Sequence, residues 1–136
     1  MDDPKIILTR DWLYRAILDL KSAKVLAEGQ PPLYATALFH CQQAAEKSIK
    51  AFLNYSDIIF EKTHNLVRLI DQAAGENSEF KSFNKKMEQL TPYVQILRYP
   101  FGMPPPTAEE FQEAYTAAED VYLFVLNLLP NKSHPE

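Results

Sequence analysis

Apolar residues recur along most of the chain at intervals of three and four, which is the period of an α-helix. This pattern predicts five helices, over about residues 9–28, 32–54, 64–74, 79–98 and 108–129. The best candidate for a β-strand, residues 57–60, is too short and too isolated to start a sheet. The sequence therefore predicts an all-α protein, an antiparallel up-and-down bundle of four long helices and one short helix.

Residue types that favour helix ends set these limits. The expected starts are marked by Thr9, by Pro31 and Pro32, by Thr63, and by a capping box of Thr107 and Glu110. Gly29 and Gly75 are expected to end the first and third helices. Pro92 is expected to interrupt the fourth helix, either by a kink or by a restart capped by Thr91.

Length and charge narrow the class of protein. A chain of 136 residues fits one domain, with a core over about 9–129 and a polar tail over 130–136. The single cysteine cannot form an internal disulfide, and no signal peptide or long apolar run is evident, so we expect a cytoplasmic protein without membrane contact. The net charge of −4 argues against bulk attraction to DNA.

The second predicted helix has a distinctly polar face. Its polar residues fall within about 60° of the pole opposite the apolar stripe; they are His40, Gln43, Glu46, Lys47 and Lys50. Such a face is typical of the solvated side of an amphipathic helix. The alternative is the wall of a pocket or an interface, where a histidine among carboxamide and ammonium groups could bind an anion.

The three histidines, at positions 40, 64 and 134, are not spaced to bind a metal together on one helix. We therefore expect neither a metal site nor a cofactor. The run VYLFVLNLL at 121–129 is apolar on almost every side, which predicts either central burial or a subunit interface. We expect a homodimer whose interface includes Val121, Tyr122, Phe124, Val125 and Leu128.

Three segments, taken in order, resemble one family. They are ALFHCQQAAEKSIKAFL at 37–53, KTHNL at 62–66 and LRYPF at 97–101. Together with the helix pattern they resemble the HEPN domain, a nucleotide-binding domain of higher eukaryotes and prokaryotes. The resemblance implies a small helical bundle, a homodimer, and often a minimal nucleotidyltransferase as partner in a toxin–antitoxin-like pair. Many such domains are metal-independent ribonucleases with an arginine followed, after four to six residues, by a histidine.

That ribonuclease motif is absent here. Arg98 is the candidate arginine, and the histidine would stand at Met103, Pro104 or Pro105. The resemblance then favours a non-catalytic module that binds a nucleotide or RNA. Its expected ligand-binding residues are His40, Gln43, Glu46, Lys47, Lys50, His64, Arg98 and Tyr99, with a phosphate near the start of the third helix.

Two alternatives stay open. One is a ribonuclease toxin with a rearranged site, in which Arg98 stabilises phosphate charge and His64 transfers protons. The other is a helical interaction module that has no ligand and whose polar face is only solvated surface.

Overall fold

The computed structural model describes residues 3–98 and 104–135. Within that part the elements are α1 (Pro4–Ala27), α2 (Tyr34–Tyr55), α3 (Leu66–Glu76), η1 (Ser78–Phe83), α4 (Asn84–Leu90), η2 (Thr91–Gln95), α5 (Ala108–Leu128) and η3 (Asn131–Ser133), where η marks a 3₁₀ helix. The described residues include no strand, and the predicted all-α bundle is confirmed. None of the helices described is both long and apolar enough to cross a bilayer.

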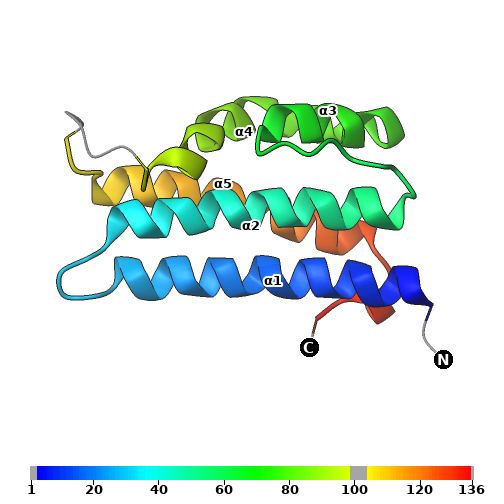
Figure 1. Cartoon of the computed structure of the whole chain (residues 1–136), viewed down its shortest axis with the longest axis horizontal. Helices are drawn as coiled ribbons and strands as arrows, with labels where there is room; N and C mark the ends of the chain where they lie inside the picture. The colour runs from blue at the N-terminus through cyan, green and yellow to red at the C-terminus, as the bar shows by residue number, and fades with distance from the viewer. Residues whose placement is uncertain (1–2, 99–103, 136) are drawn as a thin grey trace.

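The centre of the bundle is α2. Figure 1 shows α1 and α2 lying side by side and antiparallel, with α5 behind them and α3 and α4 along the opposite side of α2 from α1. Helix α2 contacts α1, α3 and α5. Because it has neighbours on several sides, 12 of its 22 residues are buried, and these include polar ones.

Two helices begin at other residues than predicted. Helix α1 begins at Pro4, because the Asp3 carboxylate accepts a hydrogen bond from the backbone N–H of Lys5 at 2.8 Å. Thr9 lies inside α1, where its buried hydroxyl accepts a hydrogen bond from Asn54. Helix α2 begins only at Tyr34, so residues 31–32 belong to the preceding loop.

The cap of α3 is Asn65 rather than Thr63. The Asn65 side chain accepts hydrogen bonds from the N–H groups of Val67 and Arg68. The Thr63 hydroxyl instead accepts the N–H of Asn65, one step before the helix. Gly75 does not end α3, which continues through Glu76. The predicted boundaries of this helix were therefore wrong by about two residues at each end.

The fourth predicted helix is not continuous. Only Asn84–Leu90 is α-helical, and the segments on both sides are 3₁₀ helices. The expected interruption at Pro92 is confirmed, since α4 ends at Leu90 and Pro92 has no N–H to donate. Thr91 does not cap a new α-helix. Its hydroxyl donates to the carbonyl of Met87 and accepts the N–H of Leu66, which ties this segment to α3.

Helix α5 begins with the predicted capping box of Thr107 and Glu110. Three of the five residues expected at a dimer interface, Val121, Tyr122 and Val125, are buried inside their own protomer. Phe124 is half-buried against the rings of Phe80 and Phe83, and Leu128 is exposed. Because α5 packs between other elements of the bundle, central burial explains most of its apolar character.

The segment after α5 folds back onto the bundle. Arg10 donates two hydrogen bonds to the carbonyl of Lys132, at 2.6 and 3.2 Å. The Nε2 atom of His134 lies 2.7 Å from the Leu126 carbonyl, and Ser133 is buried. The polar tail predicted to lie outside the core thus packs against α1 and the end of α5.

Candidate functional site

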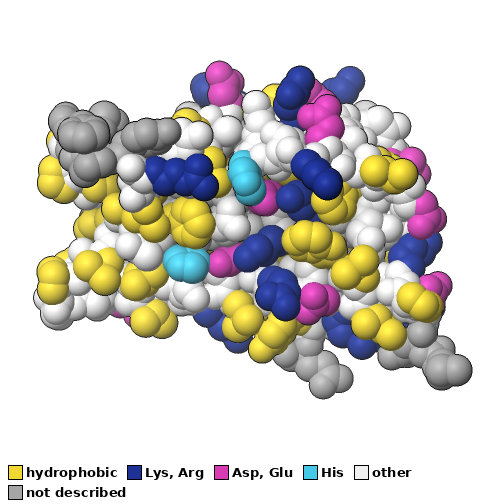
Figure 2. Space-filling view, viewed as in Figure 1, with side chains coloured by type: hydrophobic (Ala, Val, Ile, Leu, Met, Phe, Trp, Pro, Cys, Tyr) yellow, Lys and Arg dark blue, Asp and Glu magenta, His cyan; other side chains and the backbone are white. Residues whose placement is uncertain are grey.

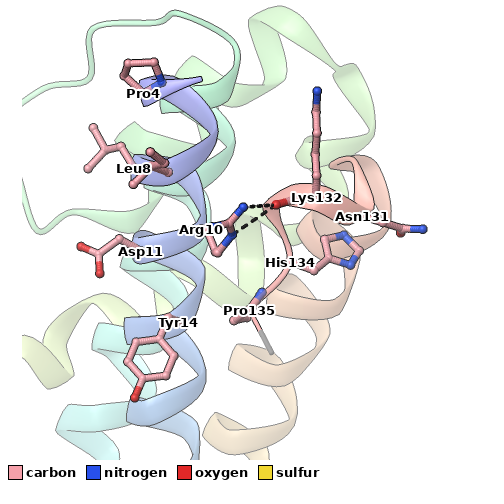
Figure 3. Close-up of a pocket in the computed structure, with 10 residues that line it drawn as sticks. Pro4, Leu8, Arg10, Asp11, Tyr14, Asn131, Lys132, His134 and Pro135 are labelled. Carbon is pink, nitrogen blue, oxygen red and sulfur yellow. Dashed lines mark hydrogen bonds between the residues drawn. The ribbon is translucent and has the colours of Figure 1, made fainter. Parts of the chain in front are cut away.

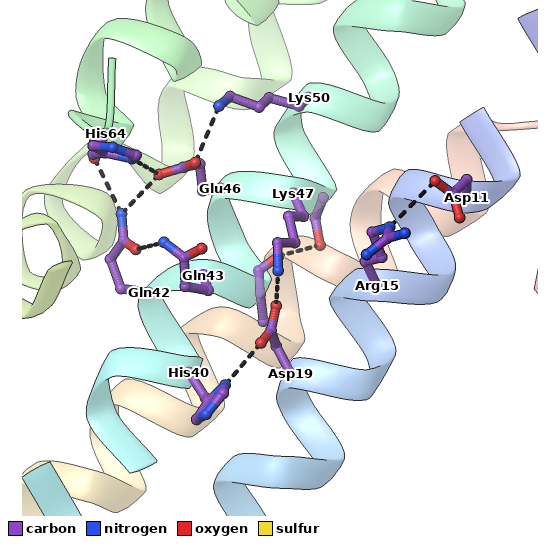
Figure 4. A network of polar contacts seen from close by, with 12 residues as sticks. Asp11, Arg15, Asp19, His40, Gln42, Gln43, Glu46, Lys47, Lys50 and His64 are labelled. Carbon is purple, nitrogen blue, oxygen red and sulfur yellow. Dashed lines mark hydrogen bonds and ion pairs between the residues drawn. The ribbon is translucent and has the colours of Figure 1, made fainter. Parts of the chain in front are cut away.

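A buried carboxylate on α1 holds part of the polar face of α2 (Figure 4). Asp19 Oδ1 lies 2.8 Å from His40 Nδ1, and Asp19 Oδ2 accepts a hydrogen bond from Lys47 Nζ at 2.7 Å. The Asp19 side chain is almost completely covered. A buried charge needs a partner to offset its desolvation, and this one has an ammonium group and an imidazole.

A second buried carboxylate, that of Glu46, organises the other part of this face. Glu46 Oε1 accepts a hydrogen bond from Gln42 Nε2 at 3.2 Å and lies 2.9 Å from His64 Nδ1. Glu46 Oε2 accepts a hydrogen bond from Lys50 Nζ at 3.0 Å. Both oxygens are thus bound, and the cluster joins α2 to the loop that precedes α3 (Figure 4).

Lys50 has aromatic neighbours in addition to Glu46. Its ammonium group lies 5.7 Å from the ring centroid of Trp12 and 5.2 Å from that of Phe60. These distances fit cation–π contacts. The ammonium group is therefore enclosed by a carboxylate and two rings, with 11% of the side chain exposed.

The prediction that this face is only solvated surface is wrong. Glu46 is buried, and His40, Lys47 and Lys50 are each mostly covered. The physical reason is the central place of α2, whose polar face meets α1 on one side and the loop before α3 on the other. Figure 2 shows histidine side chains on this face with acidic and basic side chains beside them.

His64 is fixed at its ring and at its backbone. The Nδ1 atom contacts Glu46, and the carbonyl of His64 accepts a hydrogen bond from Gln42 at 3.1 Å. Gln43 in turn donates to the Gln42 side chain at 2.7 Å. Even so, 63% of the His64 side chain is exposed. A histidine that is oriented by a buried carboxylate and whose side chain is mostly exposed is suited to proton transfer.

An open groove of about 470 Å³ lies beside this histidine. We call it the His64 groove; its lining residues are Lys62, Thr63, His64, Asn65, Thr91, Pro92, Val94, Gln95 and Arg98. The lining includes two permanent positive charges and no carboxylate. In the described part of the chain, neither Lys62 nor Arg98 forms an ion pair through its side chain.

The start of α3 does not offer free N–H groups to a phosphate. The N–H of Leu66 donates to Thr91, and those of Val67 and Arg68 donate to the Asn65 side chain. The next N–H, of Leu69, donates to the Asn65 carbonyl. The N–H groups that would bind a phosphate at this helix start are already hydrogen-bonded within the protein. The positive potential of the groove therefore comes from side chains.

The structure divides the residues expected to bind a ligand into three sets. His64 and Arg98 line the same groove. Glu46 and Lys50 lie behind His64, with half-buried Gln43 bound to their neighbour Gln42. His40 and Lys47 belong to the separate Asp19 cluster. Tyr99 lies outside the described residues.

Sequence reasoning missed Asp19, Gln42 and Lys62. Asp19 and Gln42 stand at the edges of apolar stripes; Gln42, for example, is about 80° around α2 from Tyr34. A polar residue at such an edge is a signal for hydrogen bonding between helices. Lys62 comes directly before the expected cap Thr63 and two residues before His64. A cation so close to a histidine in the sequence was a signal for an anion-binding site.

Cys41 is not a candidate nucleophile. Burial, and to a smaller extent the charge of Asp19, raises the pKa of its thiol to about 12. The thiol therefore stays protonated at neutral pH. Among the residues that the structure describes, no three His, Cys, Asp or Glu side chains are grouped closely enough to hold a metal ion.

Comparison with known proteins agrees with this architecture. Residues 9–128 match the sequence model of the family described as "HEPN domain". A protein of Methanocaldococcus jannaschii named "Putative toxin MJ1304" is 29% identical over 109 residues, which are 80% of this chain and 70% of that protein. No solved structure matches the chain. Since the family match extends from α1 to the end of α5, the chain belongs to the HEPN domain family.

Proposed function

We propose that this protein binds RNA or a nucleotide through phosphate groups in the His64 groove. The observation that supports this most directly is the charge of the lining, which has Lys62 and Arg98 and no carboxylate in a chain whose net charge is −4. A local positive groove on an acidic protein attracts phosphate selectively to that place. The volume of about 470 Å³ is in the range of small-ligand sites.

The residues that would contact phosphate are fewer than the sequence suggested. Lys47 and Lys50 are already paired with the buried carboxylates of Asp19 and Glu46. Lys62, His64 and Arg98 are exposed and face the groove. Of these, Arg98 is the strongest candidate, because a guanidinium group binds two phosphate oxygens at once.

Arg98→Ala is expected to weaken binding of a short single-stranded RNA by about tenfold or more, since a hydrogen bond to a charged group is worth about 1.5–3 kcal/mol. Fluorescence anisotropy with labelled RNA measures this, and ATP as competitor tests whether a mononucleotide enters the same groove. Arg68→Ala is the matched control, because Arg68 has the same charge but pairs with Glu61 outside the groove. Equal losses in both variants would contradict the proposal and indicate diffuse electrostatic attraction.

The second candidate function is cleavage of RNA without metal. The observation that favours it is the contact of His64 Nδ1 with a buried carboxylate, which resembles the orientation of a general acid or base. In this mechanism a ribose 2′-hydroxyl attacks the adjacent phosphorus, and the bond from phosphorus to the 5′ oxygen of the next nucleotide breaks. His64 takes the proton of the attacking hydroxyl, a water molecule protonates the leaving oxygen, and Arg98 stabilises the charge that develops on the phosphate. The name of the Methanocaldococcus jannaschii relative, "Putative toxin MJ1304", is compatible with such an activity.

His64→Ala is expected to lower any cleavage rate by about a hundredfold or more, the usual contribution of a general acid or base. The assay uses labelled RNA in EDTA, so that contaminating metal-dependent nucleases stay inactive. His40→Ala is the control, since His40 also contacts a buried carboxylate but does not line the groove. Absence of cleavage by the unaltered protein at high concentration would leave binding alone as the function.

Family membership supports two further proposals about the partners of this protein. One is that it pairs with a minimal nucleotidyltransferase in a toxin–antitoxin-like pair, and the other is that it forms a homodimer. We propose that the protein acts in the cytoplasm, where it would meet an RNA ligand. Val121, Tyr122 and Val125 are buried within their own protomer, so among the residues expected at the dimer interface only Phe124 and Leu128 keep exposed surface.

A further inference from the structure

A pocket of about 320 Å³ lies at the end of the bundle where α1 leads into α2 beside the start of α5 (Figure 1). We call it the ring pocket after three aromatic side chains that line it, Tyr34 of α2 and Phe111 and Tyr115 of α5. Phe111 is buried, whereas both tyrosines are half-buried and keep part of their surface open. The volume is at the low end of the range of ligand sites, so the pocket suits one small ring system.

The three rings of the pocket have similar orientations. The ring centroid of Phe111 lies 6.0 Å from that of Tyr34, at an interplanar angle of 30°, and 5.6 Å from that of Tyr115, at 38°. The other ring pairs among the described residues meet at larger angles, from 51° to 89°. Rings of similar orientation can be continued by a further ring, and nucleobases stack on aromatic side chains in this way.

Two side chains of opposite charge line the same pocket, and both come from the C-terminal end of α1. Lys24 lies in the last turn of the helix, and Glu28 is its C-cap residue. Both are exposed, and in the part of the chain that the structure describes neither forms an ion pair. Helical residues four positions apart have their Cβ atoms about 5–6 Å from each other. The ring pocket therefore has a hydrogen-bond donor and a carboxylate acceptor a short distance apart.

The stability of α1 accounts for Lys24 but not for Glu28. The C-terminal end of a helix carries partial negative charge, which favours a cation there and disfavours a carboxylate. Burial, followed by charges that include those of Glu119 and Glu28, raises the pKa of the Tyr115 hydroxyl. The Glu28 carboxylate thus lies within electrostatic reach of the rings. A carboxylate that opposes its own helix dipole and is open to solvent is available to accept N–H groups of a ligand.

We propose that the ring pocket binds a guanine base, either of a free nucleotide or of RNA. One edge of guanine presents two adjacent donors, N1–H and the 2-amino group, beside the acceptor O6. The two oxygens of Glu28 accept the two donors, Lys24 donates to O6, and the base stacks on the open surface of the tyrosines. Adenine, cytosine and uracil each have a single donor group on this edge, next to an acceptor that repels the second carboxylate oxygen. The charges at the pocket therefore favour guanine over the other three bases.

A larger groove does not offer the same combination. It has a volume of about 1120 Å³ and lies between the first half of α1 and residues 131–135, which the hydrogen bonds of Arg10 to Lys132 hold in place (Figure 3). Its two rings, those of Tyr14 and His134, come from different walls of the groove. Among the described residues these two rings form no ring contact, so this groove has no stack that a base could extend.

Guanosine tests the ring pocket separately from the proposed function, because it has the base but no phosphate and the pocket shares no lining residue with the His64 groove. NMR titration of the ¹⁵N-labelled full chain should show saturable shifts at the ring pocket. The affinity for guanosine should exceed that for adenosine by about tenfold or more. Equal affinities, or shifts at the His64 groove instead, would overturn the proposal. So would a proline-rich peptide that binds the ring pocket when no nucleoside does. None of these results would bear on phosphate binding in the His64 groove.

Glu28→Gln tests the choice of base. A carboxamide presents one acceptor and one donor, which matches adenine instead of guanine, so the ratio of guanosine affinity to adenosine affinity should fall about tenfold or more. Glu109→Gln is the matched control, because Glu109 is an exposed glutamate at the start of α5 that does not line the pocket, and it should keep the ratio. Circular dichroism confirms that both variants are folded. A ratio that survives Glu28→Gln, or equal losses for both nucleosides, would contradict the assignment of Glu28 to the base.

RNA ligands distinguish the two sources of the base. Fluorescence anisotropy compares an oligouridine with the same RNA that carries one central guanosine. A gain in affinity of about tenfold from that guanosine, which Glu28→Gln abolishes, would assign the base to RNA. Guanosine binding without such a gain would assign it to a free nucleotide. A gain that Glu28→Gln leaves unchanged would mean that the guanosine binds elsewhere, against the proposal.

Discussion

Replacing Phe80 with alanine is expected to lower the free energy of unfolding by about 3–5 kcal/mol, the usual cost of removing a buried aromatic side chain. Phe80 has no exposed surface, and its ring centroid lies 4.6 Å from that of Phe52 and 4.9 Å from that of Phe124. One side chain of η1 therefore joins α2 to α5. Because a domain is stable by only about 5–15 kcal/mol, the variant should unfold at far lower urea.

The control for Phe80→Ala is Ile59→Ala. Ile59 is also a large apolar residue, but it is 95% exposed, so its truncation should change the free energy of unfolding by no more than about 0.5 kcal/mol. Urea titration followed by circular dichroism measures both variants. Similar midpoints for the two would mean that Phe80 is not packed as the structure shows.

Hydrophobic spacing predicted the presence of the helices better than their limits. It located α1, α2 and α5, because burial against the bundle enforces the period of each long helix. It named Thr9 and Thr63 as N-caps where the structure has Asp3 and Asn65, since each of these four side chains can cap a helix. The choice depends on which neighbouring N–H groups the fold leaves open.

The fourth helix shows a different limit. Phe80, Phe83, Met87 and Leu90 are buried, as the spacing predicts, whereas Val94 and Leu97 of the same series are half-buried and 52% exposed. Both 3₁₀ and α segments bring residues three apart to one side. The pattern therefore predicted burial correctly only as far as Leu90, and it predicted a single α-helix wrongly. Only Pro92 indicated a break, and it could not indicate the 3₁₀ turn that precedes α4.

The candidate site was predicted by residue type and not by environment. A wheel drawn for α2 alone separates Glu46 and Lys50 from the apolar stripe, but it cannot show which elements cover that side. The carboxylate of Asp19 comes from another helix, 21 residues before His40, so no local pattern could join the two. His64 and Arg98, by contrast, were predicted to lie at one site, and they do line the same groove.

Glu46→Ala is expected to lower the free energy of unfolding by about 3–5 kcal/mol, which is the cost of breaking a buried ion pair on one side. The change leaves the enclosed ammonium group of Lys50 without its carboxylate and removes the acceptor of Gln42 and the partner of His64. Glu61→Ala is the matched control, because Glu61 pairs with Arg68 on the exposed surface at 3.6 Å. That variant should lose no more than about 1 kcal/mol.

A neutral replacement separates the charge of Glu46 from its geometry. Glu46→Gln keeps an oxygen near Gln42 and His64 but leaves Lys50 charged and unpaired, so a substantial loss should remain. Adding Lys50→Met removes that buried charge, and stability should recover relative to Glu46→Ala, since an apolar side chain between Trp12 and Phe60 needs no counter-charge. If the doubly altered protein were as unstable as Glu46→Ala, the ion pair would not be the source of the loss.

The same double variant also distinguishes the two candidate functions. Arg98 and Lys62 form no contact with Glu46, so phosphate binding in the His64 groove should be nearly unchanged when Glu46 is glutamine. The rate of proton transfer by His64 should fall, because an amide cannot stabilise the imidazolium form of His64 as a carboxylate does. Binding retained together with a cleavage rate that falls at least tenfold would assign Glu46 to the positioning of His64. Binding that falls in parallel with stability would instead mean that the cluster only supports the fold.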